Sequence, residues 1–215
     1  MNITTKLIAI SSAVSLTALT LAHAETQTFD FTGFSEIDAS AGTDVKVTVG
    51  GDYSIRAEGD AEALERLRVE LRGETLKIGR QNDRSFFTMG RKWRVMVYVT
   101  TPSLSGVDVS SGADLTASGI DAKEFTASVS SGADATLSGT CNNLRADGSS
   151  GADLKAADLK CSSAIADVSS GADLDIYASD SVTADASSGG DITVYGGPKN
   201  TNIDKSSGGG VSIRN

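Results

Sequence analysis

The sequence contains very little of the residue types on which many enzyme and metal sites depend. Its 215 residues include 1 histidine, 2 cysteines and 2 prolines. The histidine, His23, lies in a predicted signal peptide, so the exported chain would have none. This excludes Ser-His-Asp and Cys-His catalysis, and histidine-ligated zinc or copper, in their usual forms. Carboxylates remain as the groups available for acid-base or metal chemistry.

Basic and aromatic residues are also scarce. Lys and Arg number 19 against 28 Asp and Glu, the net charge is −9, and aromatic residues make up 5% of the chain. A nucleic-acid-binding protein needs a basic face to neutralise phosphates, so we exclude nucleic acid as a partner. The hydrophobic fraction of 39% is too high for a disordered chain and predicts a folded protein.

The first 24 residues are typical of a cleaved signal peptide. Lys6 precedes an apolar run over residues 7–21, which ends in Ala22-His23-Ala24. A run of about 15 residues is shorter than the roughly 20 that a membrane-spanning helix needs. Nothing later in the sequence resembles a transmembrane stretch. We therefore expect an exported protein that is periplasmic, secreted or on the cell surface, with no transmembrane segment in the mature chain.

A short internal repeat dominates the second half of the sequence. The pentapeptide Ser-Ser-Gly-Ala-Asp recurs four times, and two degenerate copies follow it. A diverged relative, Ser40-Ala41-Gly42-Thr43-Asp44, occurs much earlier. The period is close to 19 residues, which is within the range of stacked repeat proteins. The six copies begin at Ser110, Ser130, Ser149, Ser169, Ser187 and Ser206.

The residues that follow each pentapeptide alternate as in a β-strand. Positions five and seven after the first serine are apolar in every copy, as at Leu154 and Ala156, and polar residues separate them. No copy contains a helical stripe of leucines. Each repeat is therefore predicted to form short strands joined by a Ser-Ser-Gly turn, in which the glycine supplies the positive φ.

A coil of this length cannot bury its apolar side alone, so neighbouring coils must stack. The prediction is an all-β, parallel β-solenoid over residues 105–215, similar to a single-stranded β-helix, with neighbouring coils about 4.8 Å apart. The strands of an antiparallel sandwich would also show alternating apolar and polar residues. Such a sandwich would not explain one turn repeated at a constant period.

Residues 25–104 show a different pattern and are predicted to form a mainly β cap, continuous with the solenoid as one folding unit. Strands are expected at residues 45–49, 53–57 and 94–100, with a hairpin over residues 69–78. A short helix is expected over residues 61–68, with Asp60 as its cap. Such a cap would protect the open sheet edge of the first coil.

The order of these elements resembles a known family. The segment "GDAEALERLRVELRGETLKI", followed by "RVMVYVTTPSLSGVDVSSGADLTAS", is similar to the head GIN domain family of putative autotransporter adhesins. The resemblance covers roughly residues 30–214. It implies a β-solenoid-like fold in the cell envelope. It carries no established activity and no site residues.

An aspartate in each repeat forms the first candidate site. Stacked carboxylates repel one another unless they face solvent or a cation bridges them, and calcium prefers such oxygen ligands. Alternatively, each aspartate accepts backbone N–H bonds within its own turn. No other cofactor is expected. The predicted calcium ladder consists of Asp114, Asp134, Asp153, Asp173 and Asp191.

A basic, aromatic segment forms the second candidate site. Its side chains suit anionic polymers, lipid headgroups or a protein partner. The alternative is a solvated hairpin loop whose aromatic residues fold back on the end of the solenoid. The predicted binding patch consists of Arg84, Phe86, Phe87, Arg91, Lys92 and Trp93.

Cys141 and Cys161 are 20 residues apart, which is about one coil, in a chain that is expected to be exported. Two cysteines in such a chain favour a disulfide. Their distances from the repeat differ by one residue, so the repeat alone does not align them. We predict a structural disulfide between them at the corner where coil length varies.

Together these features favour a non-enzymatic envelope protein that presents a rigid β-solenoid for adhesion, scaffolding or glycan binding. Flat faces rich in Ser, Thr, Asp and Gly suit many weak hydrogen bonds to glycans or envelope polymers. One alternative is a polysaccharide-acting enzyme, which would need two Asp carboxyls in different environments within a cleft. Another is a self-assembling structural protein that pairs through the edge of its last coil.

Overall fold

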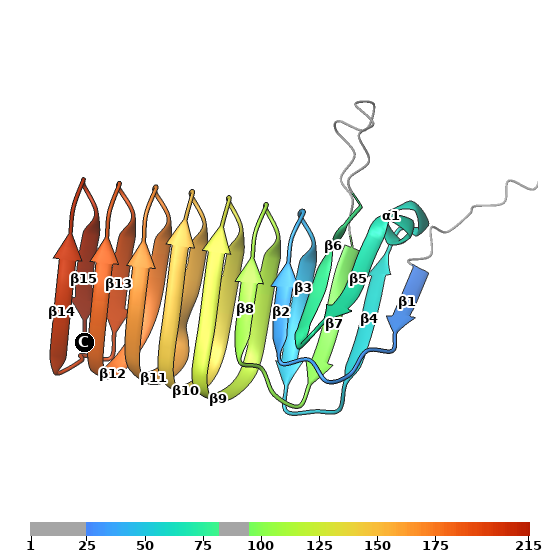
Figure 1. Ribbon diagram of the computed structural model, residues 1–215, viewed down its shortest axis with the longest axis horizontal. Helices are drawn as coiled ribbons and strands as arrows, with labels where there is room; N and C mark the ends of the chain where they lie inside the picture. The colour runs from blue at the N-terminus through green and yellow to red at the C-terminus, as the bar shows by residue number, and fades with distance from the viewer. Residues whose placement is uncertain (1–24, 82–94) are drawn as a thin grey trace, which may run out of the picture.

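The computed structural model describes residues 25–81 and 95–215 of the chain. It is 69% strand and 3% helix, with a β-solenoid of about 5 turns, which confirms the predicted fold class. Figure 1 shows the coils stacked side by side along the longest axis. The elements in chain order are β1 (Glu25–Phe29), β2 (Glu36–Ala39), β3 (Asp44–Val49), β4 (Ser54–Gly59), α1 (Ala61–Arg66), β5 (Leu67–Arg72), β6 (Thr75–Arg80), β7 (Val95–Thr101), β8 (Gly106–Val109), β9 (Asp114–Ser130), β10 (Asp134–Ser149), β11 (Asp153–Val168), β12 (Asp173–Ala186), β13 (Asp191–Tyr195), β14 (Asn200–Lys205) and β15 (Gly210–Arg214).

The coils form two sheet layers, because each long strand from β9 to β12 bends and contributes to both. The first part of β9, from Asp114, pairs in parallel with β3, and the last part, from Thr126, pairs in parallel with β8. The first sheet therefore contains β1, β4, β7, β3, the first parts of β9–β12, β13 and β15. The second sheet contains β5, β6, β2, β8, the last parts of β9–β12, and β14.

The Ser-Ser-Gly turn closes each coil by crossing from the second sheet to the first. In the first copy, Ser111 and Gly112 have φ values of 55° and 69°, and the Ala113 N–H donates to the Ser110 carbonyl at 3.2 Å. Two central residues with positive φ are typical of a type I′ turn. The expectation that the glycine alone has positive φ is incomplete, because the second serine of every copy shares it.

Hydrogen bonds between coils continue through these turns. The turn glycine of one coil donates its N–H to the second serine of the next, with Gly112 to Ser131 at 3.2 Å and Gly132 to Ser150 at 3.1 Å. The backbone is therefore paired even at the corner. A turn of different length would interrupt this pairing, which explains the constant turn.

The inward side chains are those that the alternation predicts. Leu154 and Ala156 have exposed fractions of 1% and 0%, and the turn residue Ala152 is also at 0%. The core of the coils is thin because many of its positions hold alanine. Where one coil has Gly148, the neighbouring Leu174 fills the space, and a Cβ at Gly148 would lie 2.7 Å from its Cδ2.

The N-terminal region contains coils of its own. β2 and β3 pair in parallel with β8 and β9, and the turn between them has positive φ at Ala41 (59°) and Gly42 (64°). β6 and β7 add parallel strands beyond β2 and β3. The parallel pairing of the coils therefore begins before residue 105, within the segment predicted as the cap.

The remaining N-terminal elements cover the end of the solenoid. β4 and β1 extend the first sheet in antiparallel fashion, and β5 forms the expected hairpin with β6. The helix α1 ends at Arg66, earlier than predicted, and buries Ala63 and Leu64. Asp60 is its N-cap residue but makes no side-chain capping hydrogen bond, contrary to expectation. In Figure 1, α1 and β1 lie at the end of the molecule opposite the last coils.

Candidate functional site

The predicted aspartate ladder is a continuous column on the first sheet. Asp114, Asp134, Asp153, Asp173 and Asp191 are register partners in successive strands, and Asp44 of the diverged copy extends the column by one coil. Each aspartate donates its backbone N–H to the preceding coil, as from Asp134 to Ala113 at 3.1 Å. Within residues 25–81 and 95–215, no hydrogen bond joins these carboxylates to their own turns.

Like charges in this column perturb one another. Burial is the largest cause that raises the pKa of Asp173, followed by the charges of Asp153, Asp191 and Asp175. Burial and then the charges of Asp44 and Asp134 raise the pKa of Asp114, against an opposing effect of Lys155. Both effects favour the protonated form of these two aspartates. Among the described residues, no three carboxylate, histidine or cysteine side chains converge as a metal site would require.

The other two predicted sites have different outcomes. Cys141 and Cys161 are register partners and form a disulfide with a Cα–Cα distance of 4.4 Å. A register shift between Thr136 and Ser138 absorbs the one-residue difference in their distances from the repeat. The predicted signal peptide (residues 1–24) and the basic patch lie outside the described residues. That patch comprises Arg84, Phe86, Phe87, Arg91, Lys92 and Trp93.

The outward face of the second sheet carries a further candidate site. Here three columns of mostly polar side chains run across β9, β10, β11, β12 and β14, and we call this surface the second-sheet face. The alternation predicts outward side chains, but only the register shows which of them are neighbours. The columns are Ser128, Asp147, Asp167, Asp185, Asp204; Thr126, Arg145, Ile165, Thr183, Asn202; and Glu124, Asn143, Ser163, Ser181, Asn200.

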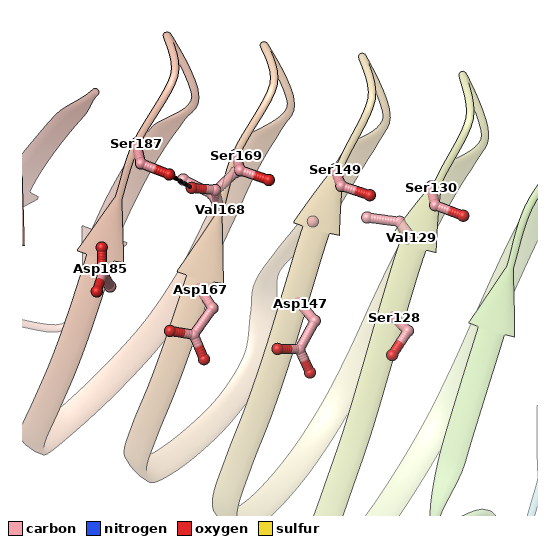
Figure 2. A pocket seen from close by; sticks show the side chains of 11 residues that line it. Ser128, Val129, Ser130, Asp147, Ser149, Asp167, Val168, Ser169, Asp185 and Ser187 are labelled. Atoms are coloured by element: carbon pink, nitrogen blue, oxygen red, sulfur yellow. Dashed lines mark hydrogen bonds between the residues drawn. The ribbon is translucent and has the colours of Figure 1, made fainter. Parts of the chain in front are cut away.

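A groove of about 450 Å³ follows this face beside the Ser-Ser-Gly turns. Figure 2 shows Ser128, Asp147, Asp167 and Asp185 in one row, with the serines at the strand ends in a second row. The first of these rows offers carboxylate acceptors at the spacing of neighbouring strands, and the second offers hydroxyl groups. The second row consists of Ser130, Ser149, Ser169 and Ser187.

A basic side chain divides this groove from a second groove on the same face. Arg145 donates to Asp147 at 2.8 Å and to Asp167 at 3.2 Å. The second groove, of about 510 Å³, lies on its other side and includes Ile165, whose exposed fraction is 49%. Its rim is ordered by hydrogen bonds within the columns, such as Asn143 to Glu124 at 2.7 Å.

The same sheet carries a third groove, of about 330 Å³, near its N-terminal end. Lys77 Nζ lies 2.6 Å from Asp38 Oδ2, and Asp108 is the register partner of Asp38. Burial and then the charge of Asp38 raise the pKa of Asp108, although Lys77 acts in the opposite direction. Gly106 lacks a side chain here, which leaves a gap in the surface between Glu36 and Thr126.

Solved structures show the same fold over most of their length. A crystal structure of a putative adhesin from Bacteroides fragilis has a TM-score of 0.68 and 17% identity, covering 89% of this chain and 97% of its own. A putative adhesin from Parabacteroides merdae has a TM-score of 0.52 and 15% identity, with coverage of 89% and 96%. A putative lipid binding protein from Parabacteroides distasonis has a TM-score of 0.51 and 14% identity, with coverage of 89% and 97%. At these identities the likeness shows the fold alone.

A search of the curated proteins finds no match to this chain. The one helix of the described residues is too short to span a membrane. Residues 33–198 match the family described as "Putative auto-transporter adhesin, head GIN domain", which is most of the chain. The parallel coils, the cap and this match agree with the resemblance seen in the sequence. The chain belongs to the head GIN domain family of putative auto-transporter adhesins.

Proposed function

We propose that this protein is an exported, non-enzymatic adhesion module of the cell envelope, and that its second-sheet face binds glycans or envelope polymers. The observation that carries the proposal is that three grooves lie on one face, along the axis of the solenoid. A polymer lying across the coils would meet similar groups at every strand, about 4.8 Å apart.

The chemistry of the face suits hydroxyl-rich ligands. Carboxylates such as Asp147 and Asp167 accept hydrogen bonds from sugar hydroxyl groups, while Arg145 and the serines donate them. Each such contact is weak, but many contacts to one chain give avidity. A structural relative is named a putative lipid binding protein. The groove beside the Ser-Ser-Gly turns is lined mainly by Ser and Asp, so it fits a polysaccharide better than an acyl chain.

The repetition of the face supports binding rather than hydrolysis. A glycosidase needs two carboxyl groups with different roles in a cleft. Here the aspartates of the first column repeat from coil to coil on an open surface, and Arg145 pairs with two of them. The alternative of a polysaccharide-acting enzyme predicts fragments of the polymer, which the binding assay below also detects.

A retention assay on residues 25–215 tests the proposal. The protein is immobilised and incubated with a panel of bacterial and host polysaccharides, with and without calcium, and both retention and released fragments are measured. The variant Asp147→Ala/Asp167→Ala removes two carboxylates from the second-sheet face. Its matched control, Asp134→Ala/Asp153→Ala, removes two from the ladder on the first sheet.

Retention that falls several-fold in the second-sheet variant and is unchanged in the control supports the proposal. Equal retention by both variants and the wild type would contradict it, as would release of fragments. If no polymer were retained, glycan binding would be contradicted and self-assembly through the last coil would be favoured.

The calcium ladder and the basic patch remain predictions of their own. Retention that depends on calcium and is lost in Asp134→Ala/Asp153→Ala would support calcium binding by the ladder. Loss of retention in the triple variant Arg84→Ala/Arg91→Ala/Lys92→Ala would support binding by the basic patch.

A further inference from the structure

The corner opposite the Ser-Ser-Gly turns departs from the repeat near the C-terminal end. Eight residues after the first serine, the earlier copies have the small residues Ser118, Ser138 and Ala157, but the next two have Tyr177 and Tyr195. These tyrosines are register partners at the end of the paired parts of β12 and β13. The repeat itself does not require this change from small to aromatic residues in adjacent coils.

Both tyrosines border a cavity of about 820 Å³. Figure 1 places this corner at the opposite side of the molecule from the turns, where the C-terminus lies. It is therefore separate from the second-sheet face and does not depend on the proposed function. The cavity is lined by Ala157, Asp158, Lys160, Tyr177, Tyr195, Gly196, Gly197 and Asn215.

Two glycines at this corner lie against side chains, Gly196 against the Tyr177 ring and Gly197 against Asn215. Gly196 has a φ of 95°, and a Cβ at this position would lie 2.8 Å from Cζ of Tyr177 and 2.6 Å from the carbonyl oxygen of Ala178. The ring of Tyr177 therefore lies against bare backbone. Gly197, with a φ of 58°, adds a second position without a side chain at the cavity.

Charged groups surround the rings. Lys160 Nζ lies 4.3 Å from the centroid of the Tyr177 ring, a cation–π contact, and 3.6 Å from Asp158 Oδ1. It also donates a hydrogen bond to the Ala157 carbonyl at 2.5 Å. The side chain of Asp158 has an exposed fraction of 86%, so its carboxylate is available to a ligand.

From this geometry we infer that the Tyr177–Tyr195 corner is a binding site for a pyranose ring of a saccharide. The apolar C–H face of a pyranose packs on an aromatic ring, while its edge presents hydroxyl groups. Tyr195 supplies the ring surface, because the cation–π contact with Lys160 already occupies Tyr177. Asp158 accepts from the sugar hydroxyls, and Lys160 and the tyrosine hydroxyls donate to them.

Other ligand classes fit this corner less well. An acyl chain would need an enclosed apolar lining, whereas Asp158 and Lys160 bring two charges to an open cavity. A nucleotide phosphate would meet the carboxylate of Asp158 beside the lysine, in a protein of net charge −9. A small, neutral, hydroxyl-rich ring meets neither obstacle.

Ligand-observed saturation-transfer NMR on residues 25–215 tests this inference, with maltose, cellobiose, lactose and chitobiose as the probes. Binding of at least one disaccharide is expected, with dissociation constants compared among the wild type, Tyr195→Ala and Tyr195→Phe. The matched control is Tyr98→Ala. Tyr98 is also on the first sheet, with the Arg56 guanidinium carbon 4.7 Å from its ring centroid, but it does not line the cavity.

We expect Tyr195→Ala to weaken binding at least tenfold, Tyr195→Phe to retain most of it, and Tyr98→Ala to leave it unchanged. Circular dichroism and thermal unfolding verify that each variant is folded. The inference is overturned if no disaccharide binds at millimolar concentration, or if Tyr195→Ala binds as the wild type does. Failure of the second-sheet variant in the polysaccharide assay would leave this result unaffected, so the two proposals fail separately.

Discussion

The N-terminal region and the repeat region build the same parallel coil in different ways. Around β2, β6 and α1, the core holds large side chains such as Phe34, Ile37 and Leu76, and the outer strands pair antiparallel. In the repeats, alanine occupies many inward positions, and one turn is used again and again. The comparison indicates that backbone pairing between coils defines the solenoid, while side-chain volume determines how its end is closed.

The largest loss of stability is expected from a substitution in the N-terminal core. Phe34 is fully buried, and its ring centroid lies 4.9 Å from that of Tyr53. Phe34→Ala should lower the free energy of unfolding by about 3–5 kcal/mol, because it leaves a cavity beneath the cap. Guanidinium unfolding followed by circular dichroism measures this. Phe29→Ala is the control, because Phe29 is only partly buried and should cost less, and an equal loss in both variants would contradict the central role of Phe34.

The next prediction concerns the covalent link between two coils. In the column of the disulfide, the neighbouring coils have Ala122 and Ala178, so alanine fits there. Cys141→Ala/Cys161→Ala should lower the free energy of unfolding by about 3 kcal/mol, since the unfolded chain loses a constraint of 20 residues. Reducing agent should lower the stability of the wild type equally and leave that of the variant unchanged. A variant as stable as the oxidised wild type would refute the stabilising role.

A substitution that adds side-chain volume, instead of removing it, tests the thin core of the coils. Ala152 has an exposed fraction of 0%, and the equivalent turn positions of the two neighbouring coils are also alanine, Ala133 and Ala172. Ala152→Leu should cost about 1–3 kcal/mol through overpacking. Thermal unfolding measures the loss, with the exposed Ile165→Leu as the control. If Ala152→Leu were neutral, the coils would have room that the buried alanines do not indicate.

The smallest expected effect concerns the charge of the ladder. The pKa of Asp173 in the folded protein is raised above its ordinary value of 3.8, so the folded state binds this proton more tightly than the unfolded state. Its contribution to stability is therefore greatest below that ordinary value, and it is lost as the pH rises through the raised pKa. Asp173→Asn should stabilise the protein at pH 7 by about 0.2–1 kcal/mol.

Thermal unfolding at pH 4 and pH 7, at low and high salt, measures this difference. The gain from Asp173→Asn should shrink at pH 4, where both states are closer to protonation, and in high salt, which screens the column. A gain that is independent of pH and salt would show that like-charge repulsion is not its cause.

Much of the repeat region was predictable because its signals are local and recur. The turn sequence, the period and the alternation after each serine occur within about 19 residues, and stacking is the way for such short coils to bury their apolar sides. The coil formed by β6 and β7 was not predicted, because it lacks these local signals. It has no Ser-Ser-Gly turn, so its membership of the solenoid depends on pairing with β2 and β3.

The candidate sites also differ in whether local sequence signals or the tertiary structure identified them. The aspartate ladder was identified because it repeats with the coil period, and the cysteine pair because two cysteines of a chain expected to be exported lie about one coil apart. The second-sheet face depends on which strands are neighbours, and the Tyr177–Tyr195 corner depends on the packing of the Tyr177 ring against the backbone of Gly196. The columns and the two tyrosines keep constant distances from the first serine of each repeat, but only the tertiary structure shows the grooves and the cavity that they line.

The sequence by itself determined the all-β class, the coil length, the Ser-Ser-Gly turns and the inward positions, because turn chemistry and alternation act between residues close in the chain. The tertiary structure decided the strand register at the corner opposite the Ser-Ser-Gly turns, where coil length varies. It also decided the positive φ of the turn serines, the additional N-terminal coils and the grooves. These features depend on hydrogen bonds between coils, which align strands across variable corner lengths. The spacing of residues along the chain does not predict that alignment.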